Sequence, residues 1–224
     1  VRRGADPQRV AVIPHGSYVG AYPDGCSRSE ARRQLGLGAD DWVCLSLGLI
    51  RPYKGLEDLL SAFRALDIPE ARLLVAGQSQ AEAYTAQLAN LAQGDPRVYF
   101  RPGYVPDEQL QVYFRAADVA VLPYRWATTS GAAYLAFAFD TPLIAPRLGP
   151  FPALVGKERG LLYDPQDGLG LLGALRAAQA LDLDSARAAC RAFNRDHAWP
   201  DLARCHIELY RKIAESGQPH ARRR

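Results

Sequence analysis

Short apolar runs, each followed by a stretch with helical periodicity, recur along most of the chain. The runs are continuously apolar rather than alternating, as in residues 72–77 (RLLVAG) and 119–124 (VAVLPY). This pattern is typical of strands in a parallel sheet whose two faces are both covered by helices. The repeat therefore predicts an α/β fold, a doubly wound and Rossmann-like parallel sheet of six to seven strands.

The expected strands and helices alternate along the chain. Residues 10–14 (VAVIP) predict a short strand, and residues 27–35 predict a helix with Ser27 or Ser29 as its N-cap. Further strands are expected at 42–49, 72–77, 98–104, 119–124, 142–146 and 160–163. Further helices are expected at 56–67, 81–93, 107–117, 131–139, 152–155 and, last among the closing helices, 201–216. In such a sheet the ligand lies at the carboxyl ends of the strands.

Composition limits the classes of protein to which the chain can belong. With 48% hydrophobic and 23% charged residues, the 224-residue chain has the balance of a globular protein with ample material for a core. No apolar run reaches the roughly 18 to 20 residues that cross a bilayer, and no signal segment opens the chain. We therefore expect no transmembrane segment and a cytoplasmic location, either free or peripheral at the inner membrane face. The four cysteines form no C-x-x-C pair, so we expect reduced structural thiols and no metal site.

Arginines are concentrated at the two ends of the chain. Three in the first nine residues and three at the C-terminus contribute much of the net charge of +3. We expect residues 1–9 to be a linker or disordered, residues 10–217 to form one domain, and residues 218–224 to be a basic disordered tail. The interior lacks a basic face with interleaved aromatic residues, so no nucleic-acid partner is expected.

A glycine-bearing turn at residues 48–55 (GLIRPYKG) lies between an expected strand and an expected helix. The N-terminus of a helix carries unpaired N–H groups and a partial positive charge, so it favours an anion. Beside the turn at Gly48, Arg51 can supply a bidentate fork and Lys54 a point charge for a diphosphate. Because spacing alone is weak evidence, the alternative is that both are solvated loop cations.

A second polar cluster follows the most apolar strand. Thr128, Thr129 and Ser130 stand where N-caps and anion ligands stand, and Gly131 allows close approach to the backbone. One of the three hydroxyls is explained by capping alone. Tyr124 at the strand tip can meet a ligand ring or simply pack. Two phosphate-compatible clusters on neighbouring loops together predict a site for a nucleoside diphosphate joined to another group.

Three common nucleotide and hydrolase motifs are missing. The sequence has no G-x-G-x-x-G after its first strand, no G-x-x-x-x-G-K-[ST] and no G-x-S-x-G. Their absence counts against a dinucleotide domain, a nucleoside triphosphatase and an α/β-hydrolase.

Several motifs resemble the C-terminal, donor-binding half of the GT-B glycosyltransferases of family 4, the group 1 transferases that use nucleotide sugars. They are residues 10–16 (VAVIPHG), 48–55 (GLIRPYKG), 74–77 (LVAG), 116–119 (AADV) with 122–123 (LP), and 141–145 (TPLIA). The resemblance covers nearly the whole chain. It implies that residues 10–217 bind a nucleotide sugar of the UDP or GDP type, with no separate cofactor and no metal.

The resemblance also implies roles for particular residues. Arg51 and Lys54 would hold the diphosphate, and the loop Gly103-Tyr104-Val105 would meet the nucleobase. Residues 128–131 would contact the donor. His15 and Gly16 form a turn at the same edge, where His15 can contact donor or acceptor or can simply be solvated. No residue is assigned as catalytic.

The chain departs from the family at two functional positions. The family usually carries two glutamates eight positions apart, and the matching residues here are Ala127 and Leu135, whose side chains accept no hydrogen bond. The sequence at 128–131 resembles a branch of bacterial polysaccharide and glycolipid transferases in which hydroxyls and backbone amides would replace those contacts. The alternative is a catalytically degenerate module that binds a nucleotide or a partner. An epimerase relative would need acidic cleft residues that are missing.

The complete GT-B fold needs an acceptor-binding N-terminal domain of similar size, and this chain begins at about the interdomain linker. The expected partner is therefore that domain or a companion chain. The implied activity is transfer of a sugar, with retention at the anomeric carbon, to a glycan or lipid-linked acceptor in polysaccharide biosynthesis.

Overall fold

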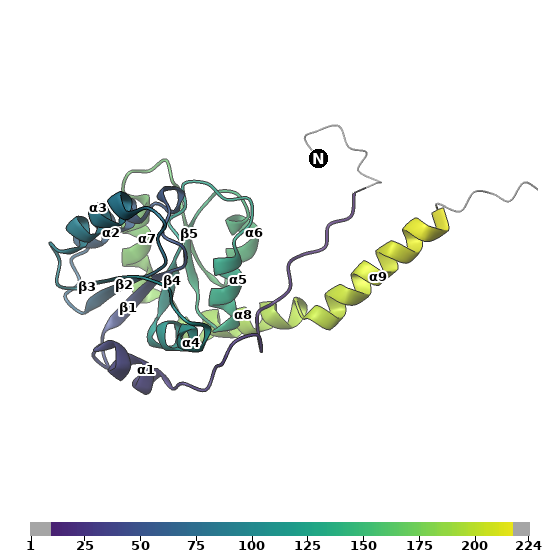
Figure 1. The fold of residues 1–224 in the computed structure, drawn as a ribbon, viewed down its shortest axis with the longest axis horizontal. Helices are drawn as coiled ribbons and strands as arrows, with labels where there is room; N and C mark the ends of the chain where they lie inside the picture. The colour runs from purple at the N-terminus through teal and green to yellow at the C-terminus, as the bar shows by residue number, and fades with distance from the viewer. Residues whose placement is uncertain (1–9, 217–224) are drawn as a thin grey trace, which may run out of the picture.

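Six parallel strands form one sheet in the order β3-β2-β1-β4-β5-β6 in the computed structural model, which describes residues 10–216 (Figure 1). The strands are β1 (Trp42–Leu47), β2 (Ala71–Gly77), β3 (Val98–Pro102), β4 (Val119–Val121), β5 (Leu143–Pro146) and β6 (Gly160–Tyr163). Every neighbouring pair is parallel. The strand order reverses between β1 and β4, and such sheets bind ligands at the point of reversal. The predicted doubly wound α/β fold is confirmed.

Helices cover both faces of the sheet. They are α1 (Arg28–Leu35), α2 (Leu56–Arg64), α3 (Glu82–Ala92), α4 (Asp107–Ala116), α5 (Gly131–Ala138), α6 (Phe151–Val155), α7 (Gly170–Ala177), α8 (Leu183–Asp196) and α9 (Trp199–Ser216), with 3-10 turns η2 (Pro52–Lys54) and η3 (Ala178–Ala180). One apolar cluster joins the sheet to α2, α3 and α7. A second joins it to α1, α4, α5, α6 and α8. The two clusters explain why the strands are apolar on both faces.

The prediction of a strand at residues 10–14 is wrong. This segment forms no strand, and Val12 is 89% exposed. The sheet ends at β3 and β6, and the segment pairs with neither. A strand needs a neighbour for its N–H and C=O groups, and an apolar run without one leaves them to water. The linker expected at 1–9 and the tail expected at 218–224 lie outside the described residues.

Local signals place most element ends within a few residues. Ser27 is the N-cap of α1, since its Oγ accepts a hydrogen bond from the Glu30 N–H at 3.2 Å. β4 ends at Val121, before Pro123. Proline has no N–H to donate to a ladder, which favours a strand end there. All four cysteines are free, and Cys44 and Cys190 are buried.

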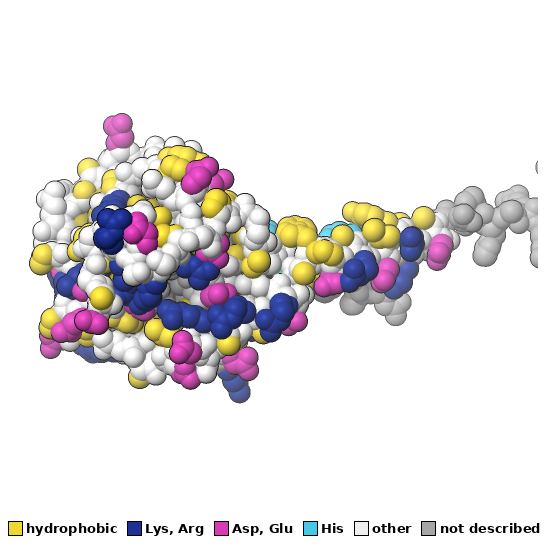
Figure 2. All heavy atoms as spheres, turned by 90° about the horizontal axis from the view of Figure 1, so that it is seen from below, with side chains coloured by type: hydrophobic (Ala, Val, Ile, Leu, Met, Phe, Trp, Pro, Cys, Tyr) yellow, Lys and Arg dark blue, Asp and Glu magenta, His cyan; other side chains and the backbone are white. Residues whose placement is uncertain are grey.

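Helix α9 extends away from the rest of the fold (Figure 1). Leu202 near its start is buried, whereas Ile207 and Tyr210 are 48% and 64% exposed. Hydrophobic side chains gather along one side of the helix and charged ones along the other (Figure 2). Within residues 10–216, no helix combines the length and the apolar character needed to cross a bilayer.

Candidate functional site

Three glycines occupy the carboxyl ends of adjacent strands. Gly48 after β1, Gly77 at the end of β2 and Gly103 after β3 have φ of 136°, 141° and 151°, a region that favours glycine. The Gly48 N–H donates to the Ala76 carbonyl at 3.0 Å, and the Gly103 N–H donates to the Gly77 carbonyl at 2.9 Å. A Cβ at Gly77 would lie 1.9 Å from the Gly48 oxygen. The strand ends therefore meet backbone to backbone, which requires glycine at Gly77.

The loop after β1 is held from both sides. Ile50 is buried and forms a parallel bridge with Ser79 in the loop after β2. On the other side, Gly55 begins α2 with φ of 64°, and a Cβ there would lie 2.2 Å from the carbonyl oxygen of Pro123. The intervening turn η2 is consequently fixed between the loops after β2 and β4. Arg51 and Lys54 extend from this rigid support.

Lys54 is not a solvated loop cation. Its Nζ lies 5.1 Å from the centroid of the Tyr124 ring and would be 3.0 Å from a Cβ added at Gly48. Burial, with a smaller contribution from Arg51, lowers the pKa of Lys54 to about 8. In the described residues, neither cation pairs with a carboxylate. An anion at this edge would supply the missing partner.

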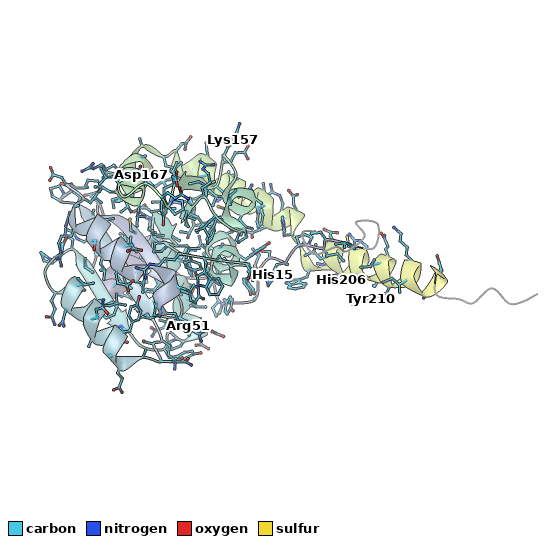
Figure 3. All side chains as sticks on the ribbon, turned by 90° about the horizontal axis from the view of Figure 1, so that it is seen from above. His15, Arg51, Lys157, Asp167, His206 and Tyr210 are labelled. Atoms are coloured by element: carbon cyan, nitrogen blue, oxygen red, sulfur yellow. The ribbon has the colours of Figure 1, made fainter. Side chains whose placement is uncertain are left out.

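Arg51 is exposed at the same edge (Figure 3). Its Nη2 donates a long hydrogen bond of 3.5 Å to Oε1 of Gln80. The structure thus brings Gly48, Arg51 and Lys54 together, with one half-buried and one exposed cation.

The loop after β4 contributes aromatic and hydroxyl side chains. Tyr124 is buried under Lys54 and packs edge-on against Tyr53 and Phe151, with ring centroids 5.8 and 5.6 Å away. Burial raises the pKa of Tyr124 to about 12. Tyr124 therefore supports the ammonium group. Trp126 lies 4.9 Å from Tyr53 and is 59% exposed, although no sequence motif pointed to it. An exposed aromatic in a loop at a strand end is the signal that could have found it.

The three hydroxyls separate into two kinds. Ser130 is buried, and its Oγ caps α5 by accepting a hydrogen bond from the Ala133 N–H at 3.3 Å. Thr128 and Thr129 are exposed just before the helix, where they can meet a ligand. Gly131 is exposed, and a Cβ there would lie 3.5 Å from the Tyr18 hydroxyl.

The turn at His15 reaches this loop from another part of the chain. Nε2 of His15 lies 3.4 Å from the hydroxyl of Tyr18, and its ring lies 4.7 Å from that of Tyr134 on α5. His15 is exposed where α9 leaves the fold (Figure 3). Gly16 is buried, and a Cβ there would lie 2.4 Å from the Trp199 ring. His15 therefore lies beside α5, which follows the hydroxyl loop, while Gly16 packs against Trp199.

The two positions that carry glutamates in the family hold no acid here. Leu135 packs against the core, and a Cβ on Gly149 would lie 2.2 Å from the Ala127 oxygen. Two acidic residues near the loop after β4, Asp58 and Glu57, are 3.0 and 3.4 Å from nitrogens of Arg125. This pairing ties the loop to α2. In the part of the chain that the structure describes, no group of three or more His, Cys, Asp and Glu side chains could hold a metal ion.

A cavity of about 570 Å³ opens beside the third glycine. Its wall includes Gly103 and Tyr104, and Tyr104 is 70% exposed. Glu82 and Thr85 of α3 also line it, and sequence reasoning did not identify them. Val105 follows as a half-buried residue. The cavity lies at the ends of β2 and β3, and β1 separates β2 from β4 in the sheet. An extended ligand that reached from the cavity to the loop after β4 would therefore cross the Arg51 and Lys54 loop, which follows β1.

Comparison with known proteins bears on the identity of this site. Residues 27–194 match the family model of the glycosyl transferases group 1. D-inositol 3-phosphate glycosyltransferase of Corynebacterium efficiens is 34% identical over 194 residues, which cover 82% of this chain and 45% of that protein. The Streptomyces scabiei protein of the same name is 32% identical and covers 92% of this chain and 49% of its own length. The chain spans about half the length of the curated relatives that it matches.

Solved structures share the fold. Sucrose-phosphate synthase from Thermosynechococcus elongatus superposes with a TM-score of 0.78 at 29% identity, over 92% of this chain and 53% of that one. Anabaena HepE in complex with UDP and glucose gives a TM-score of 0.74 at 18% identity, over 93% of this chain and 59% of that one, which supports the fold alone. The expected resemblance is confirmed, and the chain belongs to the glycosyl transferases group 1 family.

Proposed function

We propose that this chain is the donor-binding half of a glycosyltransferase, which transfers a sugar from a nucleotide-diphosphate sugar to a glycan or lipid-linked acceptor. The observation that carries the proposal is the pair Arg51 and Lys54 beside Gly48, two cations without a carboxylate partner in the described residues. A diphosphate supplies the negative charge that no carboxylate supplies to these two cations.

The nucleoside and the sugar of the donor would bind on opposite sides of the diphosphate. The cavity beside Gly103 and Tyr104 accommodates a nucleobase and ribose, with polar groups of α3 in its wall. The exposed hydroxyls of Thr128 and Thr129 lie on the opposite side and face the sugar. Support comes from the structure of HepE, which shares this fold and is described with UDP and glucose.

The reaction needs charge stabilisation more than proton transfer at this site. When the bond between the sugar and the diphosphate breaks, negative charge grows on the leaving group. Arg51, Lys54 and the backbone N–H groups of the loop stabilise that charge, and one such donor is typically worth about 3 kcal/mol. We infer retention at the anomeric carbon from family membership.

The acceptor is held by an N-terminal domain or companion chain. The chain spans about half of its relatives, which leaves a second half of similar length in those proteins. Ile207 and Tyr210 on α9 offer exposed apolar surface for such a partner.

A catalytically degenerate nucleotide-binding or interaction module is the second candidate. The observation that favours it is the absence of a carboxylate at Ala127 and Leu135, where the family usually has glutamates. Both candidates share donor binding, but only the first predicts turnover in the complete enzyme.

Thermal unfolding with added nucleotides tests donor binding. A ligand that binds only the folded chain raises the Tm by mass action. We expect UDP or GDP and the matching sugar nucleotides to raise it, and Arg51→Ala to abolish the shift. Lys157→Ala removes an exposed cation elsewhere (Figure 3) and should keep the shift, which makes it the matched control. If only nucleotides with one of the two bases raise the Tm, that base identifies the donor class. If no nucleotide raises the Tm at millimolar concentration, the result favours the interaction module.

Turnover separates the two candidates. In the complete enzyme, Arg51→Ala should lower turnover by about tenfold or more with the fold intact. Unchanged turnover for both Arg51→Ala and Lys54→Ala contradicts the assignment of the diphosphate site.

A further inference from the structure

A second polar cavity lies at the opposite edge of the sheet, at the amino ends of β4 and β5. It has a volume of about 400 Å³, and Ala117 and Thr141, which lie two residues before these strands, form part of its wall. Four arginines from α1, α4 and α8 line it, namely Arg28, Arg115, Arg187 and Arg191. Seen from below, Lys and Arg side chains form a band that runs towards the base of α9 (Figure 2).

The helical repeat of α8 explains how the arginines align. Arg187, Arg191 and Arg195 are four residues apart, so they share one face of the helix. Cys190 and Phe193 of the same helix are buried against the core. Packing of the apolar face therefore turns the arginine face towards the cavity wall and solvent.

One buried carboxylate serves several of these arginines. Asp118 is buried, and its oxygens lie 2.6, 3.0 and 3.8 Å from nitrogens of Arg28, Arg32 and Arg187. Oδ2 of Asp118 also accepts the Val43 N–H at 2.8 Å. A single negative charge thus faces three guanidinium groups.

The other carboxylates leave an excess of positive charge. Asp140 lies 3.3 Å from Arg191, and Asp24 accepts from Nε of Arg115 at 2.6 Å. Asp184 is 3.9 Å from Arg187 and is almost fully exposed, so its screening effect is small. The wall of the cavity itself holds four arginines and two aspartates, Asp24 and Asp140, which is an excess of two positive charges.

An apolar cavity adjoins the basic one. It has a volume of about 590 Å³ and shares Asp24, Asp140 and Arg191 with its neighbour. Val19 and Trp199 in its wall are 59% and 54% exposed. An apolar group attached to a phosphate in the basic cavity would therefore lie against the apolar wall of the neighbouring cavity.

We propose that the arginine-lined cavity is a second anion site, which binds a phosphate group at the edge of the sheet opposite the candidate donor site. The two sources of that chemistry are a free phosphate or phosphate ester and the headgroup of an anionic phospholipid. The inference does not depend on the proposed transferase activity, since none of its residues belongs to the donor site.

Titration of the chain with inorganic phosphate, followed by backbone amide NMR shifts, tests the site. We expect saturable shifts at Gly25, Cys26 and Asp140, which form part of the cavity wall. The double substitution Arg187→Gln and Arg191→Gln should raise the Kd by about tenfold or more, because charge-assisted hydrogen bonds are lost. Arg176→Gln removes one exposed arginine from α7, on the other face of the sheet, and should leave the Kd unchanged.

Two further variants make the result decisive. Lys54→Met removes phosphate binding at the donor site, so shifts at Asp140 that persist in this variant belong to the second site. Arg191→Gln alone changes a half-exposed side chain and serves if the double variant unfolds. No saturable shift at these amides, or equal Kd values for Arg191→Gln and Arg176→Gln, would overturn the proposal.

Vesicle flotation distinguishes the two sources. Binding to phosphatidylglycerol but not phosphatidylcholine vesicles, weakened by Arg191→Gln, identifies the lipid headgroup. Saturable phosphate shifts without flotation identify a free phosphate ester. If neither phosphate shifts nor flotation is observed, the cavity is only a structural ion-pair cluster and the proposal is wrong.

Discussion

The pH dependence of nucleotide binding tests the role of Lys54 directly. Burial lowers the pKa of this amine to about 8 in the unliganded chain. A bound diphosphate places negative charge beside the amine, which raises its pKa again and keeps it protonated. Nucleotide affinity should therefore follow the protonated fraction of the free chain. That fraction is about nine tenths at pH 7 and about one tenth at pH 9, so affinity should fall about tenfold, or about 1.4 kcal/mol.

Calorimetry with UDP or GDP measures this effect. The Kd should rise steadily between pH 7 and 9, and titrations in buffers of different ionisation enthalpy should show uptake of about half a proton per nucleotide at pH 8. Lys54→Arg is the matched control, because a guanidinium stays charged throughout this range. A flat profile for the wild-type chain, or an equal slope in Lys54→Arg, would refute the reasoning.

The same pKa has a consequence for stability in the absence of ligand. The folded pKa of Lys54 is about 8 against an ordinary value of 10.5, so between these pH values the unfolded chain binds more protons. The free energy of unfolding should therefore rise with pH through this window. Below pH 8 the buried charge costs up to about 3 kcal/mol. Lys54→Met should raise the Tm at pH 7, while nucleotide binding is lost. A lower Tm would contradict the reasoning that burial of the charged Lys54 amine destabilises the fold.

Two further predictions concern the loops at the carboxyl edge. Gly77→Ala should lower the free energy of unfolding in urea by about 3 kcal/mol or more, because its Cβ would lie 1.9 Å from the Gly48 oxygen. Gly103→Ala should lower it by about 1 kcal/mol, since only backbone strain opposes the new side chain. Equal costs would show that the backbone contact is unimportant. Ser130→Ala should lose a helix cap worth about 1 kcal/mol, while Thr129→Ala should change stability by less than about 0.5 kcal/mol and weaken donor binding. If Thr129→Ala leaves donor affinity unchanged, its hydroxyl makes no ligand contact.

The sequence alone was sufficient for the fold class and for the sheet edge that carries the candidate site. Continuous apolar runs and helical periodicity depend on neighbours along the chain, so the alternation from 42 to 163 was predictable with ends a few residues off. Parallel strands bring their following loops to one edge, which placed Arg51 and Lys54 with Thr128 and Thr129 before any contact was known.

Tertiary structure decided what each of those residues does. Residues 10–14 have the composition of a strand, but no strand lies beside them to accept their hydrogen bonds. Lys54 and Arg51 look alike as loop cations, yet only Lys54 is half-buried over the Tyr124 ring, with its pKa lowered. The arginine-lined cavity joins three helices that are distant in the sequence. Burial and charge pairing depend on contacts between distant segments, and periodicity along the chain carries no information about them.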